Sequence, residues 1–317
     1  LEPYRLLIVG LIVAVAIALL TGRLVWKRVV WGWPIALFLW LMYASLMVNA
    51  VSATVSGAIL SGFSNIVQLT FLLSVIVLVR QLLTDKKQVI ALLTFLVFAG
   101  SVIAFFAFVE RYTHFNIFMQ LQRFLPLELL RDDALSLRAG GNRSYASSQH
   151  PIALSVLFCM LTPIAVYLSE FGRWPRHPVN RRLVYLVAIG VMMVGLLSAV
   201  SRTGVVVLGA MFLFTLLIRP RLAGTLLLLS LPVAGLAALL FPKLFRSTVL
   251  SLLDFEALIA SQRQAVGLPG QGRLADIGPA MSQLGEKPWF GTGLGSRVVV
   301  GDQANAQILD NQWLGTL

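Results

Sequence analysis

The sequence predicts an all-α polytopic membrane protein with about eight transmembrane helices and a large exterior loop of short helices. Three observations predict this class. The chain is 58% hydrophobic and only 12% charged, and its mean hydropathy is +0.86, which is unlike a soluble domain. Its apolar residues form long runs, and a helix of about 20 such residues crosses a bilayer core. Connections rich and poor in basic residues alternate along the chain, as they do in multi-pass proteins.

The apolar runs place the eight spans at about 5–21, 29–50, 66–80, 89–109, 151–169, 183–200, 204–218 and 223–241. Residues 52–65 are too polar to assign to a span. The stretch 183–218 would form roughly 54 Å of helix at 1.5 Å per residue. Because a bilayer core is only about 30 Å thick, this stretch is two spans. Ser201-Arg202-Thr203-Gly204 is their junction.

The charges of the connections predict the orientation. Four connections hold 12 Lys and Arg residues against only Asp85 and Glu170: residues 22–28, 80–88, 170–182 and 219–222. The rest of the chain holds 13 Lys and Arg against 11 acidic residues. Short basic connections are cytoplasmic by the positive-inside rule, so Arg202 faces the exterior. The net charge of +12 therefore reflects topology and does not indicate a nucleic-acid partner.

The exterior segments define the expected domains. Residues 1–241 form a helical bundle with an exterior loop at about 110–150, residues 242–312 a large exterior loop, and residues 313–317 the start of a further, truncated span. Helical spacing of apolar residues predicts either amphipathic surface helices or ordinary packing inside a loop domain. The residues so spaced are Phe115, Phe118, Leu121 and Leu125, then Leu244, Val249, Leu252 and Leu253. The single cysteine, Cys159, excludes an intrachain disulfide.

Two motifs stand out in the second exterior loop. One is Gly272-Arg273, and the other is Lys287-Pro288-Trp289-Phe290-Gly291-Thr292-Gly293-Leu294-Gly295. Glycines at alternate positions let backbone N–H groups approach a ligand, although a plain turn with an interfacial tryptophan has the same pattern. The motif matches neither a Walker nor a Rossmann signature.

The order of the motifs resembles a known family. Gln149-His150-Pro151 enters a span, Ser201-Arg202-Thr203-Gly204 joins two others, and the long loop closes with Asp310-Asn311-Gln312-Trp313-Leu314. From about residue 66 onward, this order is similar to the O-antigen ligase and O-antigen polymerase superfamily of bacterial membrane glycosyltransferases. Ligases usually carry a histidine where this chain has Asp310. Asp-Asn before an aromatic residue is closer to the polymerases.

The resemblance implies a GT-C-like helical enzyme that needs no metal or other cofactor. Its donor would be a glycan linked to undecaprenyl diphosphate, and its acceptor lipid A–core or a second lipid-linked glycan. The enzyme would lie in the bacterial inner membrane, surrounded by membrane lipid, with its active face periplasmic. It would serve the synthesis of cell-surface polysaccharide.

Transfer from a lipid diphosphate needs groups that hold the anionic leaving group, and arginine binds phosphate oxygens with a planar fork. Arg202 and Arg273 are the main candidates, and Arg143 is a third. Ordinary interpretations compete with each assignment. Arg202 can be an interfacial arginine that reaches lipid headgroups, and the other two can be solvated loop charges.

The acceptor hydroxyl needs a base, and Asp310 and His150 compete for this role. Each can instead be a residue that starts a helix, since Asp and His are found there for structural reasons. We assign Gln149, Asn311 and Trp289 to sugar or acceptor binding.

The spans carry no acidic or basic residue near their middle, which disfavours an ion-coupled transporter. A flippase for lipid-linked saccharide remains the alternative function, and a non-catalytic scaffold would leave the loop motifs unexplained. We interpret Gly195, Ser198, Gly209 and Gly235 as sites of close helix packing.

Overall fold

In the computed structural model the chain forms two compact parts. One part contains residues 3–84 and 255–317, and the other contains residues 85–254. The described residues are 3–55, 57, 59–124, 137–138, 141–220, 224, 227, 235, 238–254, 256, 264–265, 268–269, 281, 285, 289 and 291.

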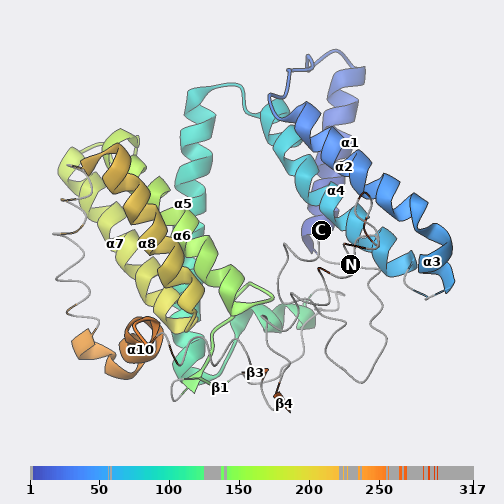
Figure 1. The fold of residues 1–317 in the computed structure, drawn as a ribbon. Helices are drawn as coiled ribbons and strands as arrows, with labels where there is room; N and C mark the ends of the chain where they lie inside the picture. The colour runs from blue at the N-terminus through green and yellow to red at the C-terminus, as the bar shows by residue number, and fades with distance from the viewer. Residues whose placement is uncertain are drawn as a thin grey trace. The chain divides into compact units, whose positions relative to one another are not determined.

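Four helices make up the described part of residues 3–84. They are α1 (Pro3–Leu20), α2 (Gly32–Val48), α3 (Ala50–Val55) and α4 (Ile59–Leu82), and α1 and α2 both pack against α4 (Figure 1). A small core forms around Ile8, Val15 and Leu78. The polar stretch 52–65 is largely helical, because α3 and the start of α4 lie within it.

A buried glutamine, Gln81, joins the end of α4 to the basic connection between α1 and α2. The Gln81 side chain is fully buried, and its amide pairs with the backbone of Lys27. Lys27 N donates to Gln81 Oε1 at 2.8 Å, and Gln81 Nε2 donates to Lys27 O at 2.8 Å. The Lys27 ammonium donates to Gln81 O at 3.1 Å. These bonds hold the connection between α1 and α2 against the end of α4.

The 85–254 part is built on α5 (Lys86–Thr113), α6 (Pro151–Phe171), α7 (Pro178–Ser198) and α8 (Arg202–Ile218), which lie side by side in Figure 1. Local signals explain their limits. Asp85 and Gln88 form a capping box at the start of α5, and prolines occupy the first positions of α6 and α7. Their core is formed by Val97, Ala104, Leu154, Phe158, Tyr185 and Met192.

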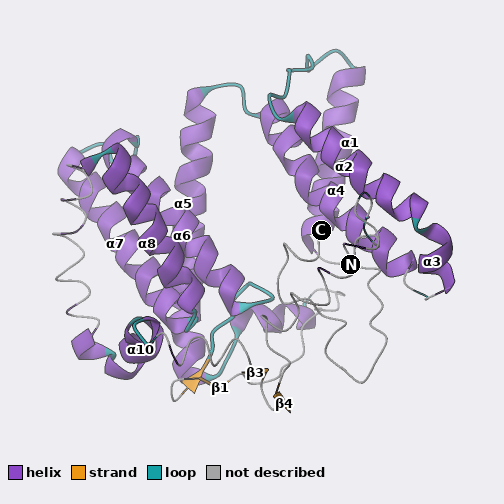
Figure 2. Ribbon diagram, in the orientation of Figure 1, coloured by secondary structure: helices purple, strands orange, loops and turns teal. Residues whose placement is uncertain are grey.

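Short elements complete the 85–254 part and the described pieces of the long loop. They are η1 (Ile117–Arg123), α10 (Pro242–Thr248) and η2 (Leu250–Leu252), with two antiparallel pairs, β1 (Leu137–Arg138) with β2 (Gly141–Asn142) and β3 (Gln264–Ala265) with β4 (Leu268–Pro269). Among the described residues strand is limited to these two short pairs, as Figure 2 shows, so the all-α prediction is confirmed.

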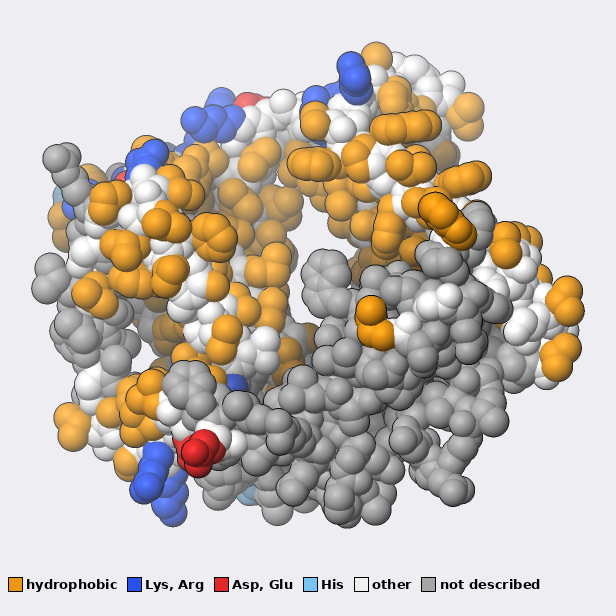
Figure 3. All heavy atoms as spheres, in the orientation of Figure 1, with side chains coloured by type: hydrophobic (Ala, Val, Ile, Leu, Met, Phe, Trp, Pro, Cys, Tyr) orange, Lys and Arg blue, Asp and Glu red, His pale blue; other side chains and the backbone are white. Residues whose placement is uncertain are grey.

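Seven of the eight predicted spans overlap helices that the structure describes, and the number of eight membrane spans stays a prediction. Four helices, α4 to α7, are long and apolar enough to cross a membrane, and Arg5–Leu20, Gly32–Val48 and Arg202–Ile218 are shorter apolar helices. Hydrophobic side chains cover the sides of the helices in Figure 3, and Phe95, Val102 and Phe214 are among the exposed ones. The chain is therefore a membrane protein. The predicted span 223–241 lies largely outside the described residues, and the predicted domain limits stay predictions.

Three sequence interpretations change in detail. The span expected to end at 109 continues as α5 to Thr113, which brings Glu110 and Arg111 into the helix. The amphipathic segments become the 3-10 helix η1 and the α10–η2 pair. Gly195 packs closely as expected, whereas nothing among the described residues lies within 4 Å of a Cβ placed at Gly209 or Gly235.

Candidate functional site

The last turn of α5 carries two buried charged residues. Glu110 is 2% exposed and Arg111 is 5% exposed. Glu110 Oε2 accepts hydrogen bonds from Tyr145 N at 3.1 Å and from Ala146 N at 2.7 Å, and Arg111 Nη1 donates to Asn142 O at 2.7 Å. The end of α5 therefore holds residues 141–150, which we name the site segment.

The site segment is also bound to the end of α7. Ser144 N donates to Ser198 O at 3.2 Å, and Arg143 Nε donates to Ala199 O at 3.4 Å. On its other side, Ser144 Oγ donates to Ala107 O at 2.6 Å. The segment that carries Arg143, Gln149 and His150 is thus fixed between α5 and the turn that leads from α7 into α8.

Two residues of this region have strained backbones. Val200, in the turn between α7 and α8, has φ +46°, and Ala146, in the site segment, also has φ +46°. A left-handed conformation is especially unfavourable for a β-branched residue such as valine. Such strain persists only where the surrounding structure holds it, and it is found preferentially at functional sites. Val200 directly precedes Ser201 and Arg202.

Arg202 and His150 come from the starts of two neighbouring parallel helices. Arg202 is the first residue of α8, and His150 is the N-cap of α6. The helices meet one turn further in, where a Cβ at Gly204 would lie 2.8 Å from Ser155 Cβ, and Cys159 Sγ donates to Gly204 O at 3.2 Å. Both helix N-termini carry partial positive charge, which favours an anion at this end of the bundle.

Several polar atoms at this end have no partner among the described residues. They are Asn142 Oδ1, Ser201 Oγ, Arg202 Nε and Thr248 Oγ1, and each is buried. A buried polar atom without a hydrogen bond costs about 1–3 kcal/mol, and more when it belongs to a charged group. Asn142 Oδ1 belongs to the site segment, and Ser201 Oγ and Arg202 Nε lie where the α7–α8 turn enters α8. The hydrogen bond from Arg143 Nε to Ala199 O joins the site segment to this turn. The arrangement is suited to a polar, anionic ligand.

The geometry refines the role of His150. Its side chain is exposed, and Nδ1 accepts a hydrogen bond from Ile152 N at 3.2 Å. In the neutral ring this cap occupies Nδ1 as an acceptor and leaves the proton on Nε2. For His150 to act as a base through Nδ1, the hydrogen bond from Ile152 N to this nitrogen must first break. Gln149 is exposed beside it.

The remaining candidates lie in the other part of the chain or outside the described residues. Trp289 is 89% exposed, and Gly291 beside it has φ +56°, which glycine adopts without strain. The carbonyl of Gly291 accepts a hydrogen bond from Asn49 Nδ2 at 3.1 Å, so the glycine-rich motif is tied to the end of α2. Arg273, Asp310 and Asn311 lie outside the described residues.

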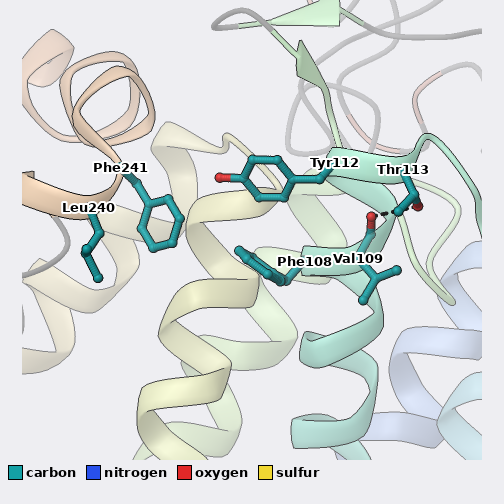
Figure 4. Close-up of a pocket in the computed structure, with 6 residues that line it drawn as sticks. All are labelled: Phe108, Val109, Tyr112, Thr113, Leu240 and Phe241. Carbon is teal, nitrogen blue, oxygen red and sulfur yellow. Dashed lines mark hydrogen bonds between the residues drawn. The ribbon is translucent and has the colours of Figure 1, made fainter.

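An apolar pocket lies on another face of the α5 end. It is lined by Phe108, Val109, Tyr112, Thr113, Leu240 and Phe241 and has a volume of about 490 Å³. Figure 4 shows the rings of Phe108, Tyr112 and Phe241 turned toward one another, and the Phe108 and Phe241 rings are 5.9 Å apart. The last turns of α5 therefore present charged groups to the site segment and aromatic groups to a space suited to hydrocarbon.

Within the described part of the chain, no three His, Cys, Asp or Glu side chains come together as a metal site would require. The expectation of metal-independent chemistry stays a prediction. No family model matches the chain, and neither a curated protein nor a solved structure matches it.

Sequence reasoning missed Glu110, Arg111, Asn142 and Ser201 as members of this site. The signal for the first pair was present, because Glu110 and Arg111 adjoin at the end of a long apolar run. Ionisable residues at membrane depth are functional candidates by default, but ending the span at 109 placed both of them in the loop. Ser201 lies in the motif that joins two spans but was given no role of its own, and Asn142 had no sequence signal.

Proposed function

We propose that this protein is a membrane glycosyltransferase of the O-antigen ligase or polymerase type. It moves glycan from undecaprenyl diphosphate to an acceptor at the periplasmic face of the bacterial inner membrane, in the synthesis of cell-surface polysaccharide. One observation carries the proposal: Arg202 Nε is buried without an acceptor among the described residues, at the start of α8. A bound diphosphate would offer acceptor oxygens to this N–H and to the Ser201 hydroxyl, at the N-terminus of α8.

In the proposed reaction, the acceptor hydroxyl oxygen attacks the anomeric carbon of the donor sugar. The bond from this carbon to the phosphate oxygen breaks, and undecaprenyl diphosphate leaves with the bonding electrons. Arg202, Arg273 and Arg143 stabilise the negative charge on the leaving group. The hydroxyl proton passes to Asp310 or His150. Gln149, Asn311 and Trp289 bind sugar, and the apolar pocket beside Phe108 is suited to the hydrocarbon of the carrier.

The proposed membrane arrangement has eight spans in a GT-C-like bundle, with the site segment and the α7–α8 turn outside. The distribution of basic residues supports this orientation, since Arg173, Arg176, Arg181 and Arg182 all belong to the connection between α6 and α7 or to the first turns of α7.

We expect a cysteine placed at Ser147 to react with a membrane-impermeant maleimide in intact cells, and a cysteine placed at Arg176 to react only after the cells are opened. Both positions are exposed in loops. The background variant is Cys159→Ser, because a hydroxyl keeps the hydrogen bond to Gly204 O. The opposite labelling pattern would invert the topology and contradict a periplasmic site.

The proposed activity is tested with the purified full-length protein and a lipid-linked oligosaccharide, with and without lipid A–core. Products are identified by mass spectrometry. Longer glycan on undecaprenyl diphosphate in the absence of lipid A identifies a polymerase, and transfer only to lipid A–core identifies a ligase. If the donor stays intact with every acceptor while still binding, the transferase proposal is wrong and a flippase for lipid-linked saccharide becomes the favoured function.

A further inference from the structure

The Glu110 carboxylate is bound to two separate segments of the chain. Its Oε2 accepts from Tyr145 N and Ala146 N, and its Oε1 accepts from Asn116 Nδ2 at 3.1 Å. Placing a carboxylate where it is only 2% exposed is costly unless several N–H groups bind it. These donors do so, which makes Glu110 the joint between the end of α5, the start of η1 and the site segment.

The direction of these bonds is determined by the neighbouring backbone. Asn116 Oδ1 accepts from Phe118 N at 2.8 Å and from Met119 N at 3.4 Å, so this oxygen caps η1. Asn116 Nδ2 must then point the other way, where it donates to Ala146 O at 3.0 Å and to Glu110. Asn116 and the site segment therefore both present donors to Glu110, and the joint requires an acceptor with two oxygens.

The joint holds the strained part of the site segment. Ala146 has φ +46°, and both its N–H and its carbonyl are bound, the first by Glu110 and the second by Asn116. These bonds determine the path of the chain through residues 143–146. They thereby hold Arg143 against Ala199 and lead to His150 at the start of α6.

We propose that Glu110 is a positioning residue for the site, and that it acts by holding the site segment so that Arg143 and His150 meet the diphosphate-linked substrate. This inference rests on the proposed function for the identity of the substrate. Glu110 does not touch the substrate in this arrangement, because its two oxygens are occupied by Asn116 and by the site segment itself.

The test is Glu110→Gln, which keeps the size of the side chain and removes one acceptor. The new NH₂ group faces the donors of Asn116 or of the site segment, so at least one bond is lost. We expect the variant to bind undecaprenyl diphosphate about tenfold more weakly, in line with the loss of a hydrogen bond to a charged group. We expect faster hydrogen exchange of the Tyr145 and Ala146 amides. The matched control is Glu170→Gln, the same change at an exposed residue.

Kinetics separate positioning from simple loss of folded protein. Poor folding lowers kcat with an unchanged KM for the donor, whereas a misplaced Arg143 raises the KM. The double variant Glu110→Gln with Asn116→Asp restores a donor–acceptor pair between the two side chains, and the introduced carboxylate can still cap η1. Lipid binding will recover only in part, because the introduced carboxylate oxygen at position 116 cannot donate to Ala146 O as Asn116 Nδ2 does. We expect at least about a threefold gain in affinity over the single variant.

Unchanged lipid binding and unchanged amide exchange in Glu110→Gln would overturn the inference, and so would a double variant no better than the single one. If the wild type binds undecaprenyl diphosphate and the variant binds it more weakly, but neither transfers glycan, the positioning role stands and the transferase proposal fails. If the wild type does not bind the lipid at all, both are wrong.

Discussion

Replacing Arg202 with lysine is expected to lower glycan transfer by about 100-fold, the usual effect of removing one preorganised charge-stabilising donor from an active site. The guanidinium Nε is buried without a partner among the described residues, and it is placed at the first position of α8. A lysine ammonium keeps the charge but is a single point, so it cannot donate from two nitrogens to a diphosphate. The quantity to measure is kcat/KM for the lipid-linked donor.

The matched control for this variant is Arg219→Lys. Arg219 is exposed and follows the last residue of α8, so the same chemical change occurs at the opposite end of the same helix. We expect near-normal transfer there and an unchanged thermal midpoint in both variants. Full activity of Arg202→Lys would rule out the bidentate contact to the diphosphate. We expect Arg143→Lys to have a smaller effect, because Arg143 Nε already donates to Ala199 O.

A large loss of stability is expected for Gly195→Ala. A Cβ at this position would lie 2.6 Å from Ala104 Cβ, 2.8 Å from Ala104 Cα and 3.0 Å from Phe158 Cε2. Ala104 Cα is a backbone atom of α5 and Ala104 Cβ is attached directly to it, so neither can move aside without separating α5 from α7. Overpacking of this kind costs about 1–3 kcal/mol. Thermal unfolding in detergent is expected to show a lower midpoint.

Gly190→Ala is the control, because Gly190 lies in the same helix and nothing among the described residues is within 4 Å of its added Cβ. There the methyl group gains helix propensity, by up to about 1 kcal/mol, and the midpoint should not fall. Equal destabilisation of the two variants would contradict close packing of α5 and α7 at Gly195. Small residues are used in this way wherever membrane helices approach closely.

The contact at Gly195 also explains how the bundle positions the site. Gly195 lies one turn before Ser198 and Ala199, whose carbonyls bind the site segment. When α7 lies close to α5, Ser144 can reach Ala107 on α5 and Ser198 on α7 at the same time. We infer that a small residue at 195 serves both the stability of the bundle and the geometry of the candidate site.

The sequence by itself determined the class of the protein and most of its helices. Long apolar runs and their caps are local, so α5, α6, α7 and α8 start at or within a few residues of the predicted positions. Arg202 was recognisable because a charged residue that interrupts two apolar runs is costly unless it has a role.

Only the tertiary structure decided that Glu110 and Arg111 belong to the helix and to the site. A charged residue normally ends a predicted span, because its transfer from water to an apolar environment is unfavourable. Apart from Asn116, which is six residues from Glu110, the partners that offset this cost come from residues 142–146, more than 30 positions along the chain. No local pattern encodes such a pairing. It exists because α5 and α7 pack closely and leave the site segment held between their ends.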